Sequence, residues 1–251
     1  MMEREIQIVS DSAALLRTAA EIYISAARQS VAKSGRFAVA LSGGSTPKEV
    51  YSLLADDAEL CSQVPWRQTY FFFGDERNVG PNDSESNYRM AQEAMLAKLP
   101  IDTSQVHRIK SEGQDIAMAA TLYADDLRRF FQPKAGEFPR FDLVLLGLGP
   151  DGHTASLFPG TRALQERNLW VCPNWVPKLQ AYRITLTVPV INHAVRVLFL
   201  VRGGDKAQAV KAVLEGAYEP QQLPAQMINP HSGSLSWLLD RAAGAFLERQ
   251  R

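Results

Sequence analysis

Residues 141–160, FDLVLLGLGPDGHTASLFPG, constrain the fold of this chain more than any other stretch. The stretch begins with a nearly uninterrupted apolar run of strand length, which is typical of a strand covered on both faces in a parallel sheet. Gly147, Gly149 and Gly152 then allow the backbone to turn sharply and to approach a ligand closely. Because ligands of open α/β sheets bind beyond the carboxyl ends of the strands, His153 is placed for chemistry.

The same glycines fit the dinucleotide-binding pattern G-x-G-x-x-G, but the surrounding sequence argues against that function. Pro150 stiffens the turn, and Pro159-Gly160 limits a following helix to about two turns. The pattern also requires an acidic residue that closes a second strand about twenty residues further on. Glu166 lies near that distance, but its neighbours LQERN do not form a strand sequence. We therefore do not expect nicotinamide or flavin binding.

Strand-like runs and helical spacings alternate along the rest of the chain. Further strands are expected at residues 5–9, 37–41, 70–73, 106–109, 170–172, 184–188 and 195–201. Helices are expected from Asp11 or Ser12 to Lys33, at 47–54, 87–99 and 116–131, after 203–205, and at 234–246. This alternation predicts a doubly wound α/β fold with a mainly parallel sheet flanked by helices. Without a repeat or a clear linker, one domain over residues 1–251 is expected.

Charge and cysteine content exclude several classes of partner. Lys and Arg together number 27, as do Asp and Glu, so no net charge attracts nucleic acid or an anionic membrane. Cys61 and Cys172 form no metal-binding or disulfide pattern, which suits a reducing compartment. Residues 1–10 lack the apolar core of a signal peptide, and no run approaches the roughly 20 apolar residues of a membrane helix. We expect a soluble, cytoplasmic protein.

A second glycine loop follows the strand expected at residues 37–41. Its residues Ser42, Gly43, Gly44, Ser45 and Thr46 precede Pro47, which suits the start of a helix. Free N–H groups and the helix dipole make such a terminus an anion site. The loop lacks the spacing and the lysine of a P-loop, so a nucleoside triphosphate is not expected. Alone it also fits a tight structural turn, but two such loops together favour a sugar phosphate.

Charged residues follow the strand expected at residues 70–73. Arg77 has a planar guanidinium that suits a phosphate or an oxyanion, and Asp75 or Glu76 has the carboxylate of a general base. The alternative is a structural ion pair that closes the loop. Further along, Arg183 opens the run RITLT, and Lys206 lies near the start of a helix behind two glycines. A cation at that position is a candidate phosphate ligand, although a surface lysine fits equally well.

His153 differs from the other three histidines in its position. His107, His193 and His231 have ordinary strand or loop neighbours, which favours structural or solvated roles. His153 lies between a glycine and a threonine at a strand end, and an imidazole ordinarily titrates near neutral pH, as a general base or acid requires. No other histidine or cysteine has ligand spacing to it, so no metal site is expected.

Taken together, these motifs resemble the 6-phosphogluconolactonase family. The matching stretches occur in family order: LSGGSTP (41–47), GDER (74–77), SNYRMAQEAML (86–96), GLGPDGHTASLFPG (147–160), RITLT (183–187), Lys206-Ala207 and, in the tail from Pro224, WLLDRAA (237–243). One departure is Pro177-Lys178-Leu179-Gln180, where the family tends to have Pro-Lys-Pro-Pro. The resemblance implies a fold shared with glucosamine-6-phosphate isomerase/deaminases and with sugar-phosphate sensor domains of bacterial regulators.

Those two groups provide the alternative functions. The deaminases follow Asp-Gly-His with Ile-Ala-Phe-Asn-Glu, where this chain has Thr154-Ala155-Ser156-Leu157-Phe158, and they carry Asp-Glu-Tyr where it has Asp75-Glu76-Arg77. The regulators add a helix-turn-helix domain, whereas this sequence starts directly in the α/β pattern. Both comparisons favour the lactonase.

The resemblance implies hydrolysis of 6-phospho-D-glucono-1,5-lactone to 6-phospho-D-gluconate in the oxidative pentose phosphate pathway. In this hypothesis His153 activates water, Asp151 orients the imidazole, and Arg77 or backbone N–H groups stabilise the oxyanion. The predicted phosphate ligands are Ser42, Gly43, Gly44, Ser45, Thr46, Arg183 and Lys206. The mechanism requires no cofactor and no metal. Besides its sugar-phosphate substrate, the chain is expected to act without nucleic acid or membrane, as a monomer or a small homo-oligomer.

Overall fold

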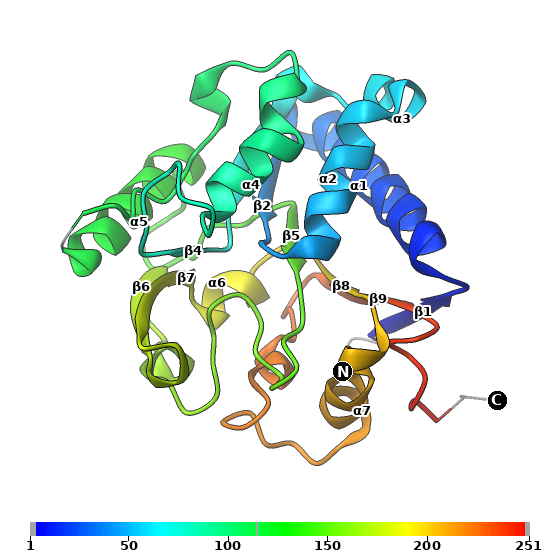
Figure 1. Ribbon diagram of the computed structural model, residues 1–251. Coiled ribbons are helices and arrows are strands. Elements are labelled where there is room, and N and C mark those ends of the chain that lie inside the picture. Colours follow the sequence, from blue (N-terminus) through cyan, green and yellow to red (C-terminus); the bar gives the residue numbers. More distant parts are fainter. Residues whose placement is uncertain (1–3, 114, 249–251) are drawn as a thin grey trace.

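Two sheets and the helices around them make up the protein (Figure 1), and the computed structural model describes residues 4–113 and 115–248. The strands of the larger sheet are β1 (Glu5–Val9), β2 (Phe37–Leu41), β3 (Thr69–Phe73), β5 (Leu143–Leu146), β8 (Arg196–Val201) and β9 (Ser234–Asp240). They lie in the order β1-β9-β8-β5-β2-β3 and every neighbouring pair is parallel. This order confirms the predicted doubly wound parallel sheet. Residues 1–3, 114 and 249–251 of the predicted domain lie outside the described residues.

Helices cover both faces of this sheet, with α1 and α2 on one side and α7 on the other (Figure 1). The α-helices are α1 (Ser12–Ser34), α2 (Ser45–Asp56), α3 (Ala58–Gln63), α4 (Asn87–Ala94), α5 (Ile116–Phe131), α6 (Val188–Asn192) and α7 (Ala207–Glu215). Short 3₁₀ helices are η1 (Trp66–Gln68), η2 (Leu96–Lys98), η3 (Thr103–Gln105), η4 (Arg162–Gln165), η5 (Pro177–Leu179), η6 (Gly204–Lys206) and η7 (Pro224–Met227). Within the described residues, no helix is both long and apolar enough to span a membrane.

Local signals explain the helix bounds that the sequence predicted closely. Asp11 caps α1, because its carboxylate accepts a hydrogen bond from the backbone N–H of Ala14 at 2.9 Å. Gly35 ends the same helix in the left-handed region at φ 76°, which a glycine adopts without strain. Asp115 caps α5 in the same way through the N–H of Met118.

A separate antiparallel sheet was not predicted. It consists of β4 (Asp75–Arg77), β6 (Val171–Val176) and β7 (Ala181–Leu186), in the order β4-β7-β6. The sequence predicted strands at 170–172 and 184–188 but read residues 75–77 only as a loop. Three charged residues do not resemble a strand, and β4 exists because its backbone pairs with β7, about 110 residues later in the chain.

The predicted closing helix at residues 234–246 is wrong, because β9 occupies its first half. Apolar residues in a strand covered on both faces do not alternate, so LSWLLD is equally compatible with helical spacing. The segment forms a strand because it pairs in parallel with β8 on one side and β1 on the other. The indole of Trp237 then stacks on the ring of Phe199, with centroids 3.8 Å apart.

Smaller differences concern helix ends and one weak strand. Helix α2 begins at Ser45 rather than at Pro47, and the helix predicted at 87–99 is interrupted after Ala94, with η2 following. Residues 106–109 form no strand, only an isolated bridge between Val106 and Phe71. The short helix expected after the turn at 147–152 is also absent, and residues 153–160 form turns and an isolated bridge between Thr154 and Leu157.

The strand order places a crevice at the carboxyl ends of β2 and β5, which are neighbours in the sheet. In the larger sheet, the next strand of the chain after β2 is β3, which lies on one side of the β5–β2 pair. The next strand of this sheet after β5 is β8, which lies on the other side of the pair. Loops that leave adjacent parallel strands in opposite directions separate, and such switch points form ligand sites. Both predicted glycine loops therefore border one crevice.

Candidate active site

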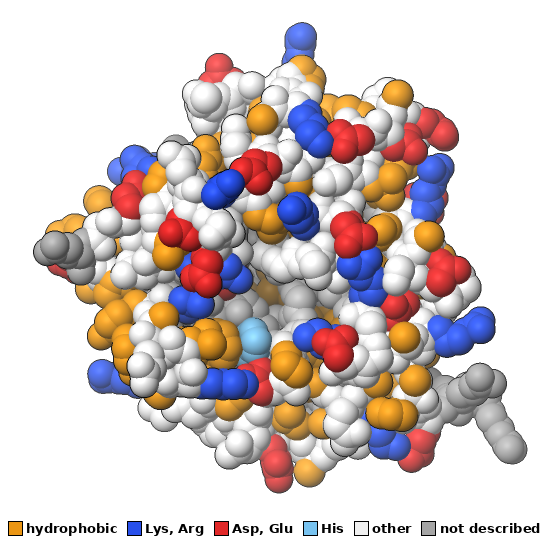
Figure 2. Space-filling model, viewed as in Figure 1, with side chains coloured by type: hydrophobic (Ala, Val, Ile, Leu, Met, Phe, Trp, Pro, Cys, Tyr) orange, Lys and Arg blue, Asp and Glu red, His pale blue; other side chains and the backbone are white. Residues whose placement is uncertain are grey.

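A cavity of about 260 Å³ occupies this crevice. In the space-filling view the surface is hollowed near its centre, with a histidine at the base of the hollow and charged side chains around it (Figure 2). The lining residues come from both glycine loops, β4, the start of α4 and the segment after β8. They include Ser42, Gly43, Gly44, Ser45, Thr46, Asp75, Arg77, Asn87, Gly149, His153, Arg202 and Lys206.

The loop after β5 holds the imidazole of His153 in one orientation. Its Nδ1 lies 2.5 Å from Oδ1 of Asp151, and one ring face stacks on Phe158 with centroids 4.0 Å apart. Gly149 must lack a side chain, because a Cβ atom there would lie 2.0 Å from Nδ1 of His153. The predicted contact between Asp151 and His153 is therefore present, and the loop glycine makes room for it.

The carboxylate of Asp151 fixes the tautomer of this imidazole. Partial burial raises the pKa of Asp151, but hydrogen bonds from His153 and Lys178 outweigh it and lower the pKa to about 2. An ionised carboxylate can only accept a hydrogen bond, so Nδ1 of the imidazole carries the proton and the lone pair of the neutral ring lies on Nε2. Among the described residues, none hydrogen-bonds to Nε2, which leaves that nitrogen able to act as a base.

The loop after β2 lines the same cavity and offers backbone N–H groups there. Gly44 adopts φ 103° and precedes α2, and neither Ser45 nor Thr46 donates its N–H to another described residue. The hydroxyl of Tyr51 fixes the loop by bonding both the N–H and the carbonyl of Ser42 at 2.9 Å. Lys206 also lines the cavity, with Nζ 3.2 Å from the carboxylate of Asp205. These groups together suit an anion.

The three charged residues of β4 have different environments. Glu76 is buried and does not line the cavity, because it accepts hydrogen bonds from the N–H groups of residues 77, 87 and 88 and from the hydroxyl of Ser86. Burial raises its pKa, but its role is to hold the start of α4. Asp75 lines the cavity and accepts from Ser156 Oγ at 2.6 Å and from Asn87 Nδ2 at 3.3 Å. Arg77 lines the cavity as well.

Arg183 lies apart from the other predicted phosphate ligands. It pairs with Arg77 across β4 and β7, so the two guanidinium groups belong to one face of the antiparallel sheet. Burial, followed by the charge of Arg77, lowers the pKa of Arg183. Arg183 does not belong to the residues that line the cavity, whereas Lys206 does. The structure therefore places Lys206 and the loop after β2 in the lining of one cavity, whereas Arg183 lies beside Arg77 in the antiparallel sheet.

Comparison with known proteins identifies the family of this chain. Residues 10–237 match the family model of glucosamine-6-phosphate isomerases/6-phosphogluconolactonase. A 6-phosphogluconolactonase of Nostoc is 38% identical over 98% of this chain and 99% of its own length. One of Synechocystis is 39% identical over 97% and 98%. The chain belongs to this family. The solved 6-phosphogluconolactonase of Trypanosoma cruzi, at 29% identity, superposes with a TM-score of 0.84 over 98% of both chains.

Sequence reasoning missed several residues that complete the site in this family member. Asn87 fills the space beside Gly43, where a Cβ atom would lie 2.0 Å from Oδ1 of Asn87. Ser156, in the loop after β5, donates a hydrogen bond to Asp75 and so connects this loop to β4. Arg202 lines the cavity and pairs with Glu49 at 2.7 Å. Both Asn87 and Ser156 lie inside the stretches that carry the family resemblance, which was the available signal. No local signal pointed to Arg202.

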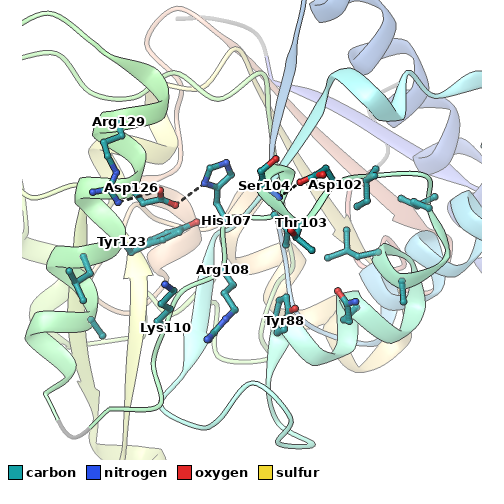
Figure 3. Close-up of a pocket in the computed structure, with 18 residues that line it drawn as sticks. Tyr88, Asp102, Thr103, Ser104, His107, Arg108, Lys110, Tyr123, Asp126 and Arg129 are labelled. Atoms are coloured by element: carbon teal, nitrogen blue, oxygen red, sulfur yellow. Dashed lines mark hydrogen bonds and ion pairs between the residues drawn. The ribbon is translucent and has the colours of Figure 1, made fainter.

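A larger cavity of about 670 Å³ lies between α4, α5 and residues 99–110. There His107 points at Asp126 on α5, while Arg108 and Lys110 lie on the opposite side of the pair from Arg129 (Figure 3). Nδ1 of His107 is 2.8 Å from Oδ2 of Asp126. Size therefore does not identify the active site, because this cavity lacks the glycine loops of the switch point.

Neither cavity offers the ligand set of a metal ion. Among residues 4–113 and 115–248, no three His, Cys, Asp or Glu side chains come together in a way that could hold one.

Proposed function

We propose that this chain hydrolyses 6-phospho-D-glucono-1,5-lactone to 6-phospho-D-gluconate, with His153 as the general base. The observation that carries the proposal is the imidazole of His153, held by Asp151 at 2.5 Å, in a cavity that is also lined by the glycine loop at the start of α2. A lactone that carries a phosphate matches both ends of this cavity. The 6-phosphogluconolactonases to which the chain is similar support the same reaction.

In the proposed mechanism, Nε2 of His153 takes a proton from a water molecule whose oxygen attacks C1 of the lactone. The tetrahedral intermediate collapses as the bond between C1 and the ring oxygen breaks, and the imidazolium returns its proton to that oxygen. Asp151 stabilises the imidazolium and keeps the ring in place. A positioned base contributes roughly 10²–10⁴-fold, which suits a substrate that also hydrolyses spontaneously.

We assign the oxyanion to Arg77 rather than to the loop after β5. The N–H of Gly149 already donates to the carbonyl of His153 at 2.8 Å, and that of Gly152 donates to Gly149 at 3.0 Å. Arg77 lines the cavity and carries a guanidinium that can donate to a developing negative charge. Asp75 is not needed as a base, because both of its carboxylate oxygens accept hydrogen bonds from neighbouring side chains.

The phosphate is assigned to Ser42, Gly43, Gly44, Ser45, Thr46 and Lys206. The free N–H groups at the start of α2 and the ammonium of Lys206 supply charge-assisted hydrogen bonds. In this proposal Arg183 lies beside Arg77, near the lactone ring rather than near the phosphate.

We also propose that residues 1–251 form a single domain.

One pair of assays separates the lactonase from its alternatives. Acid release from freshly prepared 6-phosphogluconolactone is followed above the spontaneous rate, and ammonia release from glucosamine 6-phosphate is followed with the same stock. We expect acid release alone. Ammonia without lactone hydrolysis would identify a deaminase, and sugar-phosphate binding without turnover of either compound would identify a sensor.

A further inference from the structure

The carboxylate of Asp151 contacts a second cation besides the imidazole. Oδ1 lies 2.5 Å from Nδ1 of His153, and Oδ2 lies 2.9 Å from Nζ of Lys178. Lys178 is 27 residues further along the chain than Asp151, in a different part of the fold. The carboxylate therefore bridges the proposed base and a lysine, with one oxygen for each.

Lys178 lies at the tip of the hairpin that β6 and β7 form. Residues 177–180 form its tip, where Gln180 adopts the left-handed region at φ 48°. Behind the tip, Trp175 and Tyr182 are direct cross-strand neighbours, and their rings pack edge to face with centroids 4.9 Å apart. Aromatic cross-strand pairs stabilise a hairpin. The Lys178 side chain is 66% exposed, but its backbone belongs to a turn that this aromatic pair stabilises.

The same hairpin also contacts the segment that follows His153 in the chain. Asn174 of β6 is fully buried, and its Nδ2 donates to the carbonyl of Ser156 at 2.9 Å and to Oγ1 of Thr161 at 3.0 Å. The hairpin therefore contacts the loop after β5 through Asn174 within β6 as well as through Lys178 at its tip. The contact of Asn174 limits where the lysine can reach.

We propose that Lys178 is a positioning residue, which holds the Asp151 carboxylate against His153 and partly offsets its charge, so that the imidazole stays unprotonated. The inference rests on the proposed role of His153 as base. An isolated carboxylate beside a histidine favours the charged imidazolium, and a charged imidazole cannot accept a proton from water. The ammonium of Lys178 opposes that effect. Other charges around the cavity are Asp75 and Arg77 on β4 and Arg202 and Lys206 after β8.

The test replaces Lys178 by Met, which keeps the length of the side chain and removes its charge, and by Arg, which keeps the charge. Lys98→Met is the matched control, because Lys98 also pairs with an aspartate at 2.8 Å but lies on η2, away from the cavity. For each variant, the protonation midpoint of the His153 ring is followed by NMR, and the lactonase rate is followed against pH.

We expect Lys178→Met to move the protonation midpoint and the acid limb of kcat/KM upward by about half a pH unit, the effect of one nearby charge in a partly solvated site. Lys178→Arg should restore the wild-type midpoint, and Lys98→Met should leave it unchanged. An unchanged midpoint in Lys178→Met, or an equal shift in Lys178→Arg, overturns the inference. Because the NMR midpoint needs no turnover, it tests Lys178 even if the wild-type protein hydrolyses no lactone, which would instead contradict the proposed function.

Discussion

The protein contains two histidine–aspartate pairs that look alike as contacts and differ in everything around them. His153 lies 2.5 Å from Asp151, and His107 lies 2.8 Å from Asp126. In both pairs Nδ1 faces the carboxylate and the pKa of the carboxyl group is lowered, for Asp126 chiefly by the hydrogen bond from His107. By the geometry of the contact alone, either pair qualifies as a catalytic dyad.

His107 lines the larger cavity, but its ring is packed between aromatic side chains. The ring stacks on Phe72 with centroids 4.4 Å apart and packs edge to face with Phe130. Its Nε2 atom is buried and has no hydrogen-bond partner among the described residues. A proton cannot pass between a substrate and a nitrogen enclosed in this way, so His107 acts as an aromatic packing residue that Asp126 orients.

The surroundings of His153 keep one ring nitrogen accessible. One face of the ring is covered by Phe158, Gly149 leaves room beside Nδ1, and the ring borders a cavity that the glycine loop after β2 also lines. A histidine therefore acts as a base because it has access to the substrate and lies near charges that bind the substrate, and an aspartate partner alone is not enough.

The largest expected effect distinguishes the two histidines directly. His153→Asn should lower kcat by roughly 10²–10⁴-fold while phosphorylated ligands still bind, because a base acts mainly in the transition state. His107→Asn should leave kcat within about twofold and lower Tm by a few degrees, since it removes packing. Steady-state kinetics and thermal unfolding measure both variants. Residual activity of His153→Asn within threefold of wild type would show that another residue is the base.

The next effect tests the charges that surround His153. A charge-assisted phosphate contact contributes about 1.5–3 kcal/mol, so unphosphorylated glucono-1,5-lactone should lose about two orders of magnitude in kcat/KM. Lys206→Ala should lower kcat/KM for the phosphorylated lactone by about 10–100-fold and hardly change the bare lactone. Lys211→Ala, on α7 but outside the cavity lining, is the control. Equal losses on both lactones would remove Lys206 from the phosphate site.

Local sequence signals predicted the elements that local interactions determine. The start of α1 at Asp11 or Ser12, the range of α5, the strand at residues 37–41 and the glycine loops all follow from neighbouring residues. The contact between Asp151 and His153 was also predictable, because only Gly152 separates them. The family and its fold were predicted correctly because each motif that carries the resemblance is a short continuous stretch of sequence.

Long-range pairing determines what the sequence did not reveal. β9 is a strand because β8 and β1 flank it, and β4 is a strand because β7 pairs with it. The contact of Lys178 with Asp151 depends on the length of a hairpin, and that of Ser156 with Asp75 spans 81 positions. A surface lysine and a loop serine have no property in the sequence that marks such contacts.

A smaller effect tests the space that the glycine provides. Gly149→Ala should displace the imidazole, because the new Cβ would lie 2.0 Å from its Nδ1, and a displacement of about 1 Å can cost 10²-fold in rate. We expect at least a tenfold loss of kcat with a smaller change in KM. Gly80→Ala is the matched control, since a Cβ atom there meets nothing within 4 Å. If both variants retain full activity, the tight packing at Gly149 is not required for catalysis.

The smallest effect concerns the stability of the protein in acid and follows from the ionised carboxylate of Asp151 in its pair with His153. The pKa of Asp151 is about 2 in the folded protein, against an ordinary value of 3.8. Because the folded value is the lower one, the stabilisation is fully present above pH 3.8 and is lost as the pH falls toward 2. The gap corresponds to about 2.4 kcal/mol in full, and solvent screening of this partly exposed pair reduces it to about 1 kcal/mol.

Urea unfolding of wild type and Asp151→Asn at pH 5, 4 and 3 isolates this contribution, because every other carboxylate titrates in both proteins. The wild type should be more stable at pH 5, and its advantage should shrink at pH 3 as the unfolded chain takes up the proton first. A difference that stays constant over this range would mean that Asp151 titrates alike in both states. The bridge between His153 and Lys178 would then hold the carboxylate in place without stabilising its charge, and the upward shift expected for Lys178→Met would lose its physical basis.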